Sequence, residues 1–150
     1  MKSRTTTLLY LNCKNLNDRI YNTESANKIL KDYKEKIKKC EFFYGCLEED
    51  VYELSISRTV NLKLISHIVE DMWIKNNKLC AKIKILNTPK GKLLNDIFDI
   101  CHFTTSCKGF VDKSGFANVD ELYTVYPVSF ENFAYKHIIL REKKLKRILK

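Results

Sequence analysis

The stretch from residue 79 to 109 carries the clearest pattern of apolar and polar positions in the chain. Apolar residues occupy every second position from Leu79 to Ile85, with two lysines between them, which predicts a β-strand. Thr88 and Pro89 then predict the start of a helix, because Thr is a good N-cap and Pro suits the first helical position. The pattern therefore changes from strand to helix at about residue 88.

One face of this predicted helix is apolar, and a second strand follows it. The residues on that face recur at helical spacing; they are Leu93, Leu94, Ile97, Phe98 and Cys101. The strand that follows ends in a short polar run, residues 104–109. We therefore expect a strand–helix–strand unit that presents this polar run at the end of a strand, held in place by a packed core.

The N-terminal third predicts one strand and one helix. Residues 8–13 are apolar enough for a short strand, and residues 14–21 form a polar loop. Residues 24–39 repeat apolar side chains at helical spacing, and Thr23 is the expected cap. Lysines fill the other face of this helix.

The middle of the chain favours antiparallel strands. Residues 42–47 are apolar and lead into an acidic run, and residues 51–57 are a further strand candidate. The turn residues 75–78 separate two strand-like segments, Ile65–Trp73 and Leu79–Leu86, so we expect a β-hairpin there.

The C-terminal part predicts a last strand at Leu122–Val128 and a helix from about residue 131 to the end. Strands outnumber helices and are joined by hairpins. This predicts an α+β domain with a mainly antiparallel sheet or a small β-barrel and flanking helices. We expect one domain, residues 1–134, followed by a basic helix or tail, residues 135–150.

Composition and charge limit the class of protein. The chain has 150 residues, 45% of them hydrophobic, which is typical of a globular domain. No apolar run is long enough to cross a bilayer, and the N-terminal apolar segment is too short and polar for a signal peptide. We therefore expect a soluble, intracellular protein that is not secreted and has no membrane contact.

The net charge of +9 favours acidic partners, nucleic acid among them. The excess is greatest near the C-terminus, where residues 141–150 contain six Lys or Arg and one Glu. This tail could contact an acidic protein or DNA, or it could be only a solvated helix. The abundance of Lys, Asn and Ile is also typical of AT-rich genomes, so the charge alone does not establish a function.

The cysteines and histidines do not predict a metal site. Six cysteines are scattered, with no C-x-x-C motif and no metal-like pairing with the three histidines. We expect free thiols, several of them in the core, and no metal or other cofactor.

Six stretches, in order, resemble the prohead core proteases of tailed bacteriophages, the assemblin-like serine proteases of capsid maturation. Family motifs of the form N-x-N-G-R-I-Y-P, G-E-L-x-H-P, S-H-I-I, I-L-x-T-P-x-G-K, S-S-R-G and P-S-F have similar counterparts here. The matching residues are 15–21, 45–49, 65–69, 85–92, 106–109 and 129–132.

The resemblance implies a function and a place of action. It implies an assemblin-like fold and a serine endopeptidase that cleaves scaffold and major capsid proteins during head maturation. Such a protein would act inside the phage prohead in the host cytoplasm, and it could form a homo-oligomer. The resemblance places the nucleophile at Ser106.

The chain departs from the family motifs at the chemistry. Glu49 stands where the family has its expected basic His, and Lys108 replaces the Arg of S-S-R-G. Tyr126 lies where an acidic member is expected. These departures also fit an inactive relative that serves as a structural component of the head.

The residues themselves leave several bases open for Ser106. A serine nucleophile needs a base within hydrogen-bond reach. His67 lies on a predicted internal strand, His102 could share a face of an extended segment with Ser106, and His137 lies in the C-terminal helix. Glu49 could act as base if burial raised its pKa.

Neighbours of Ser106 have their own possible roles. Cys107 could replace Ser106 as the nucleophile, and Lys108 with the amide of Gly109 could hold an oxyanion. Each residue also has a structural interpretation: a strand hydroxyl, a hydrogen-bonded core histidine, a half-buried thiol or an exposed lysine. A third hypothesis is a small basic nucleic-acid-binding domain, although no recognised motif for one is present.

Overall fold

The computed structural model describes residues 2–15, 18–47 and 62–128 of the chain. Several predicted features lie outside these residues. They are Glu49, the strand at 51–57, the P-S-F-like segment at 129–132, the helix from residue 131 with His137, and the basic tail at 135–150. In the part that is described, no helix is both long and apolar enough to cross a membrane.

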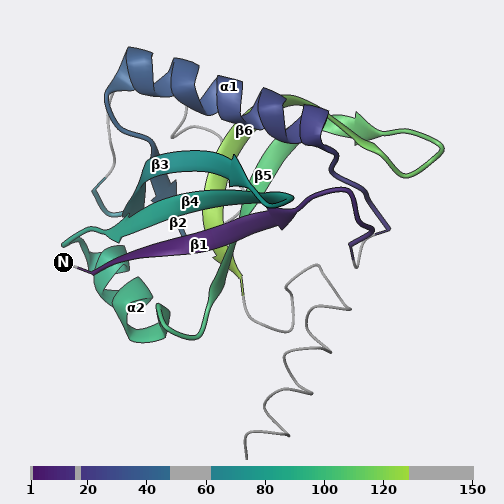
Figure 1. Cartoon of the computed structure of the whole chain (residues 1–150). Helices are drawn as coiled ribbons and strands as arrows, with labels where there is room; N and C mark the ends of the chain where they lie inside the picture. Colours follow the sequence, from purple (N-terminus) through teal and green to yellow (C-terminus); the bar gives the residue numbers. More distant parts are fainter. Residues whose placement is uncertain (1, 16–17, 48–61, 129–150) are drawn as a thin grey trace, which may run out of the picture.

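Two antiparallel sheets and two helices make up the described fold, so the α+β prediction is confirmed (Figure 1). A four-stranded sheet has the order β1-β4-β3-β2, and a second sheet contains β5 and β6. The elements are β1 (Ser3–Tyr10), α1 (Thr23–Cys40), β2 (Tyr44–Cys46), β3 (Ile65–Lys75), β4 (Lys78–Ile85), α2 (Pro89–Ile97), β5 (His102–Val111) and β6 (Ala117–Val128).

The predicted hairpin is confirmed as β3 and β4. The strands pair in antiparallel register from His67 opposite Ile85 to Lys75 opposite Lys78. Asn76 and Asn77 form the turn with φ angles of 51° and 58°. Asn tolerates this left-handed conformation better than most residues, and two such residues suit the tight turn of a hairpin.

The first strand begins earlier than the pattern indicates. β1 runs from Ser3 to Tyr10 and pairs with β4, whereas residues 8–13 were the predicted strand. Polar Thr5 and Thr7 lie within it because β1 is at the edge of its sheet and only part of it contacts the core.

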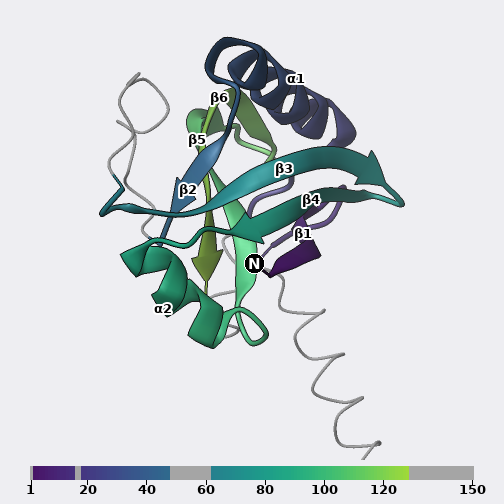
Figure 2. The ribbon, with the colours of Figure 1, turned by 90° about the vertical axis from the view of Figure 1, so that its left-hand side faces the viewer.

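Helix α1 begins at Thr23, one residue earlier than predicted. Asn22, rather than Thr23, is the N-cap, and its side-chain oxygen accepts a hydrogen bond from the Ser25 amide at 2.8 Å. Ala26, Ile29 and Tyr33 are buried. The helix lies across the upper side of the fold, over β3 and β6 (Figures 1 and 2).

Helix α2 begins where predicted, but its apolar face is only partly buried. Thr88 is the N-cap and Pro89 the first helical residue. Leu94, Phe98 and Cys101 are buried, as expected. The prediction that Leu93 and Ile97 share the buried face is wrong, because the helix packs on the sheets with one side and these two residues lie on the other.

The prediction that the polar run 104–109 lies at a strand end is also wrong. β5 continues through this run to Val111 and pairs along its length with β6. The long partner strand supplies ladder hydrogen bonds beyond the apolar part of β5. Two register shifts, after Ser106 and after Lys108, interrupt the pairing.

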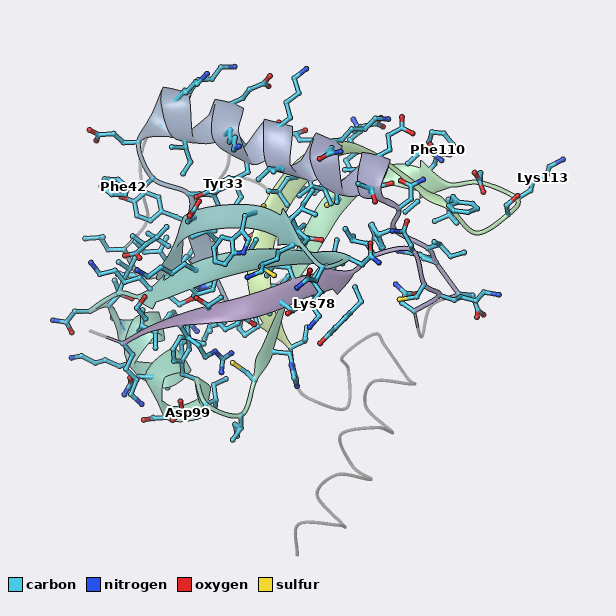
Figure 3. The ribbon with its side chains drawn as sticks, in the orientation of Figure 1. Tyr33, Phe42, Lys78, Asp99, Phe110 and Lys113 are labelled. Carbon is cyan, nitrogen blue, oxygen red and sulfur yellow. The ribbon has the colours of Figure 1, made fainter. Side chains whose placement is uncertain are left out.

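A single apolar core lies between the two sheets and under the helices. Residues from both sheets and from α1 and α2 contribute to it, among them Leu8, Ile29, Ile83, Leu94, Phe103 and Leu122. Polar side chains surround this core on the outside (Figure 3). The β5–β6 hairpin extends beyond the core, where Phe110 and Lys113 lie at its outer end (Figure 3).

Candidate active site

Ser106 lies in the middle of β5, opposite Thr124 of β6. Alternation along the strand points Phe103 and Thr105 toward the core, and Ser106 to the other face, where it is half-buried. Among residues 2–15, 18–47 and 62–128, no group hydrogen-bonds to the Ser106 hydroxyl. The two register shifts leave their extra residues, Tyr123 and Asp120, in β6, opposite the Ser106–Gly109 part of β5.

His67 lies in β3 and is completely buried. Its Nε2 is 2.8 Å from the backbone oxygen of Val125 in β6, and its Nδ1 is 2.8 Å from the Ser66 hydroxyl. Because a carbonyl oxygen only accepts, Nε2 carries the proton and Nδ1 accepts from Ser66. Both ring nitrogens are therefore occupied, and the hydrogen bond to Val125 joins one sheet to the other.

The surroundings of the imidazole favour its neutral form. Burial lowers the pKa of His67 from 6.5 to about 4, although the hydrogen bond to Val125 acts in the opposite direction. The ring packs edge-on against Phe103, with centroids 5.3 Å apart. It also covers Gly45 of β2, where a Cβ atom would come within 2.1 Å of Nε2. Gly45 therefore leaves the space that the imidazole fills.

His102 begins β5 and shares a strand face with Ser106, but it is far along the strand. No register shift lies between the two residues. A rise of about 3.3 Å per residue puts their Cα atoms roughly 13 Å apart. The described structure thus brings neither His67 nor His102 into position as a base for Ser106, and Glu49 lies outside the described residues.

Cys107 is a neutral thiol under ordinary conditions. Burial raises its pKa to about 12, and nearby Asp32 adds to the effect, while Thr105 and Lys36 oppose it. Since the thiolate is the reactive form, this environment does not activate Cys107. Lys108 and Gly109 are exposed, and Gly109 is closely packed on the backbone of the facing strand, where an added Cβ would lie only 2.0 Å from the oxygen of Asn118.

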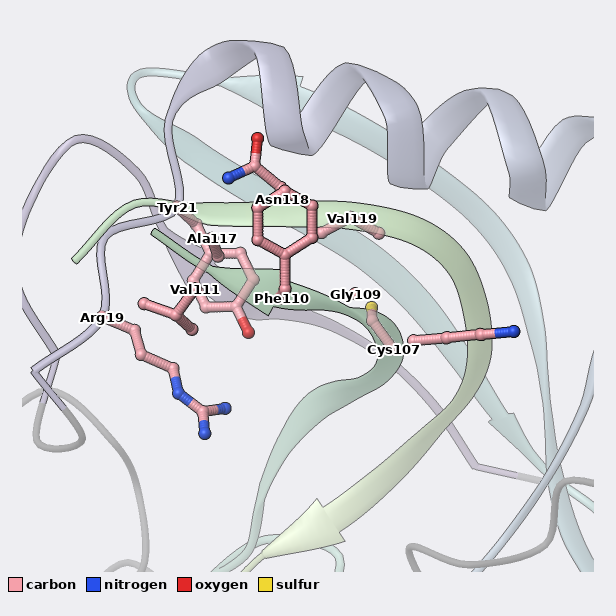
Figure 4. A pocket seen from close by; sticks show the side chains of 10 residues that line it. Arg19, Tyr21, Cys107, Gly109, Phe110, Val111, Ala117, Asn118 and Val119 are labelled. Carbon is pink, nitrogen blue, oxygen red and sulfur yellow. The ribbon is translucent and has the colours of Figure 1, made fainter. Parts of the chain in front are cut away.

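A groove lies beside the β5–β6 hairpin (Figure 4), and the first β5 residue in its lining is Cys107, the residue after Ser106 in the sequence. It has a volume of about 190 Å³, and its lining comes from β5, β6 and the loop before α1. The lining residues are Arg19, Tyr21, Cys107, Lys108, Gly109, Phe110, Val111, Ala117, Asn118 and Val119. Its lining includes Cys107, Lys108 and Gly109, the three residues that follow the candidate nucleophile.

Two stretches that resemble the protease motifs meet at this groove. Ile20 connects the loop to β6: its amide donates to the Gly115 oxygen at 2.7 Å, and its oxygen accepts from the Ala117 amide at 2.8 Å. This places Arg19 and Tyr21, from the N-x-N-G-R-I-Y-P-like stretch, beside the S-S-R-G-like stretch. Sequence reasoning did not select Arg19 and Tyr21 as site residues, although the first motif contained both.

Tyr21 and Arg19 give the groove a partly buried hydroxyl beside a cation. Burial raises the pKa of Tyr21, and the Arg19 guanidinium, which is hydrogen-bonded to it, acts in the opposite direction. The hydroxyl therefore stays protonated at neutral pH. Together with Lys108, these side chains provide donors to an acceptor-rich ligand such as a peptide backbone.

A second hollow of about 560 Å³ lies beside α2, between Lys2, Leu86 and Lys92. Within the described residues, no group of three or more His, Cys, Asp or Glu side chains is arranged to hold a metal ion.

Comparison with known proteins identifies the fold. No protein-family model matches the sequence, and no curated protein sequence matches it. Among solved structures, the bacteriophage T4 capsid assembly protease, gp21, is similar, with a TM-score of 0.64 and 22% sequence identity. The match covers 84% of this chain and 80% of that chain. The chain therefore has a phage prohead protease-like fold, as its sequence motifs predicted.

Proposed function

We propose that this protein is a peptidase of phage head assembly, which cleaves scaffold and capsid proteins inside the prohead. The observation that carries this proposal is the fold that it shares with the T4 capsid assembly protease over most of both chains. Ser106, which directly precedes the groove-lining residues Cys107–Val111 in β5, is the proposed nucleophile.

The proposed mechanism is acyl transfer to serine. The Ser106 oxygen attacks the carbonyl carbon of the scissile peptide, and its proton passes to a base and then to the leaving amine. The backbone N–H groups of Lys108 and Gly109 are the groups that we propose to stabilise the oxyanion. Water then hydrolyses the acyl-enzyme.

Glu49 is the base that we propose. His67 has no lone pair to spare in this arrangement, and His102 is about four strand residues from Ser106. In the sequence, Glu49 comes two positions after Leu47, the last described residue beyond β2. A carboxylate can act as a general base when its surroundings raise its pKa toward neutrality.

One observation favours a second candidate function, a non-enzymatic component of the head. The imidazole of His67 serves to join two sheets, and the described chain offers Ser106 no hydrogen-bonded base. A protein of this kind would contact scaffold or capsid proteins through the same fold without cleaving them.

A serine-directed probe separates the two functions. The full chain is treated with a fluorophosphonate, and the labelled residue is identified by mass spectrometry. A peptidase is expected to be labelled at Ser106, with labelling lost in Ser106→Ala and reduced at least about tenfold in Glu49→Gln. Ser114→Ala, in the exposed β5–β6 turn, is the matched control and keeps the labelling.

Cleavage of head proteins tests the substrate. Purified scaffold and capsid proteins of the same phage are incubated with the wild-type chain and with Ser106→Ala, and fragments are followed by mass spectrometry. Fragments produced by the wild type alone support the peptidase. An absence of labelling and of fragments, with binding to the scaffold protein retained, supports the non-enzymatic component.

A further inference from the structure

An apolar stripe lies on the outer face of α2 and of the turn that follows it. Leu93, Ile97 and Ile100 are spaced by four and three residues and are 54%, 40% and 73% exposed. The turn continues the helical path, because the amides of Ile100 and Cys101 both donate to the Ile97 oxygen at 3.0 Å. A spacing of three or four residues places these large apolar side chains on one face of the helix, as in helices that pack on one another.

The charges of α2 oppose its own dipole. Lys90 and Lys92 lie in its first turn, which has no acidic residue, and the last turn has no basic residue. Asp96 lies in that last turn, and Asp99 follows shortly after it (Figure 3). A lone helix prefers acidic residues at its N-terminus and basic residues at its C-terminus. This arrangement is thus unfavourable for α2 alone.

An antiparallel partner with the same sequence reverses that disadvantage. It brings the acidic C-terminal half of one helix beside the basic N-terminal half of the other, and the two dipoles then also oppose each other. A two-fold contact needs only one surface, which each copy presents to the other. We propose that the stripe of Leu93, Ile97 and Ile100 is a homodimer contact in which two α2 helices pack antiparallel.

The side-chain positions fit this geometry. With the two-fold axis near residues 96–97, Leu93 of one copy faces Ile100 of the other. Lys92 and Asp99 are seven residues apart, about two turns, so both lie on the same side of the stripe. In an antiparallel pair the same sides meet, and Lys92 of one copy lies near Asp99 of the other.

The intramolecular contact of Asp99 does not compete strongly with this pairing. Its carboxylate is 3.7 Å from the Lys2 ammonium, and both side chains are at least half exposed. Exposed ion pairs of this kind contribute little free energy. Asp99 is therefore available to a second cation.

Sedimentation of the full chain over a range of concentrations tests the contact. We expect a concentration-dependent dimer for the wild type. Ile97→Glu is expected to be monomeric at the same concentrations, because it puts a charge at the centre of the apolar seam. Phe110→Glu is the matched control: it also replaces an exposed apolar residue, but on the β5–β6 hairpin, and it keeps the dimer.

Charge reversal tests the antiparallel pairing. Lys92→Asp and Asp99→Lys are each expected to weaken dimerisation at least about tenfold, because like charges then face each other. A mixture of the two variants restores the dimer as a heterodimer, since the carboxylate introduced in one copy then meets the ammonium introduced in the other. Lys2→Ala leaves the dimerisation Kd unchanged. Circular dichroism shows that each variant is folded.

Three results would overturn the proposal. One is a wild-type chain that sediments as a monomer at every concentration, for example because another segment covers the stripe. Another is an Ile97→Glu variant that associates like the wild type. The third is a mixture of the charge variants that associates no better than either variant alone.

Discussion

At the scale of single residues, His67 is the histidine whose surroundings the structure defines most completely. Its Nε2–H group donates to Val125 and its Nδ1 accepts from Ser66, so the neutral ring is fixed in one tautomer. Protonation of Nδ1 would remove the acceptor for the Ser66 hydroxyl and place a charge in the core. The ring is therefore a pH-sensitive part of the fold, whatever the chemistry at Ser106.

The protein is expected to lose stability between pH 6.5 and pH 4. In this range His67 binds a proton in the unfolded protein but not in the folded protein, so acid favours unfolding. The stability associated with the neutral ring is fully present above pH 6.5. A shift from 6.5 to about 4 corresponds to about 3 kcal/mol. Urea unfolding of the wild type at several pH values measures this loss.

Substitution identifies the residue responsible. In His67→Gln the amide can still donate to Val125 but does not titrate, so the fall in stability between pH 6.5 and pH 4 should become about 3 kcal/mol smaller. His102→Gln should keep the wild-type slope. An unchanged slope in His67→Gln would mean that other groups cause the acid sensitivity.

Gly45 is expected to be intolerant of even one methyl group. Gly45→Ala places a carbon inside the van der Waals distance of the His67 ring and should reduce the free energy of unfolding by about 1–3 kcal/mol. In a His67→Ala background the ring is absent, and the same substitution should cost clearly less. A double-mutant cycle in urea measures the difference, and additive effects would contradict the contact.

At the scale of elements, α2 is fixed at both ends by side chains. At its start, the Thr88 hydroxyl accepts from the Gly91 amide at 3.0 Å and donates to the Ile65 oxygen at 2.6 Å. At its end, Arg4 of β1 donates to the oxygens of Phe98 and Cys101, and its guanidinium lies 4.7 Å from the centroid of the Phe98 ring. The helix is thus tied to β3 and to β1.

Thr88→Ala is expected to destabilise the protein by about 1–2 kcal/mol. It removes the N-cap and leaves the Gly91 amide and the Ile65 carbonyl without this partner. Thr88→Ser keeps the hydroxyl and should recover most of the loss. Thermal unfolding of the three chains provides the comparison, and equal losses in both variants would show that the methyl group, not the hydroxyl, matters.

At the scale of the whole molecule, both sheets depend on one core. Phe103 of β5 contacts His67 of the larger sheet and Phe98 after α2, with ring centroids 5.3 and 6.0 Å apart. Helix α1 is tied to β6 by Lys36, whose ammonium lies 3.2 Å from the Glu121 carboxylate, and by Asp32, which accepts from the Leu122 amide at 2.7 Å. We therefore expect the described part of the chain to unfold as one cooperative unit.

Phe103→Ala tests this cooperativity. The variant should lose about 3–5 kcal/mol because a fully buried ring leaves a cavity. Trp73, the single tryptophan, lies in β3 of the other sheet and reports on it by fluorescence. Its unfolding transition should shift together with that seen by far-ultraviolet circular dichroism. Separate transitions would indicate that the sheets unfold independently.

Local signals predicted the fold better than they predicted the site. The alternation before Ile85, the turn at Asn76 and the cap at Thr88 depend on neighbours in sequence, and each appears where the pattern placed it. The full path of β5 could not be predicted in this way, since its pairing with β6 joins residues as far apart as His102 and Val128. The pairing of His67 with Val125 spans 58 positions and has no local signal.

Several residues of the motifs that resemble the prohead proteases have packing roles in this structure. Gly45 makes room for a ring, His67 bridges two sheets, and Gly91 sits where a Cβ would come within 1.9 Å of the Leu86 carbonyl. Folding alone would select for these residues, with or without catalysis. A search that uses them as its pattern will therefore collect chains by shared architecture, and a chain that has lost its chemistry would still be retrieved.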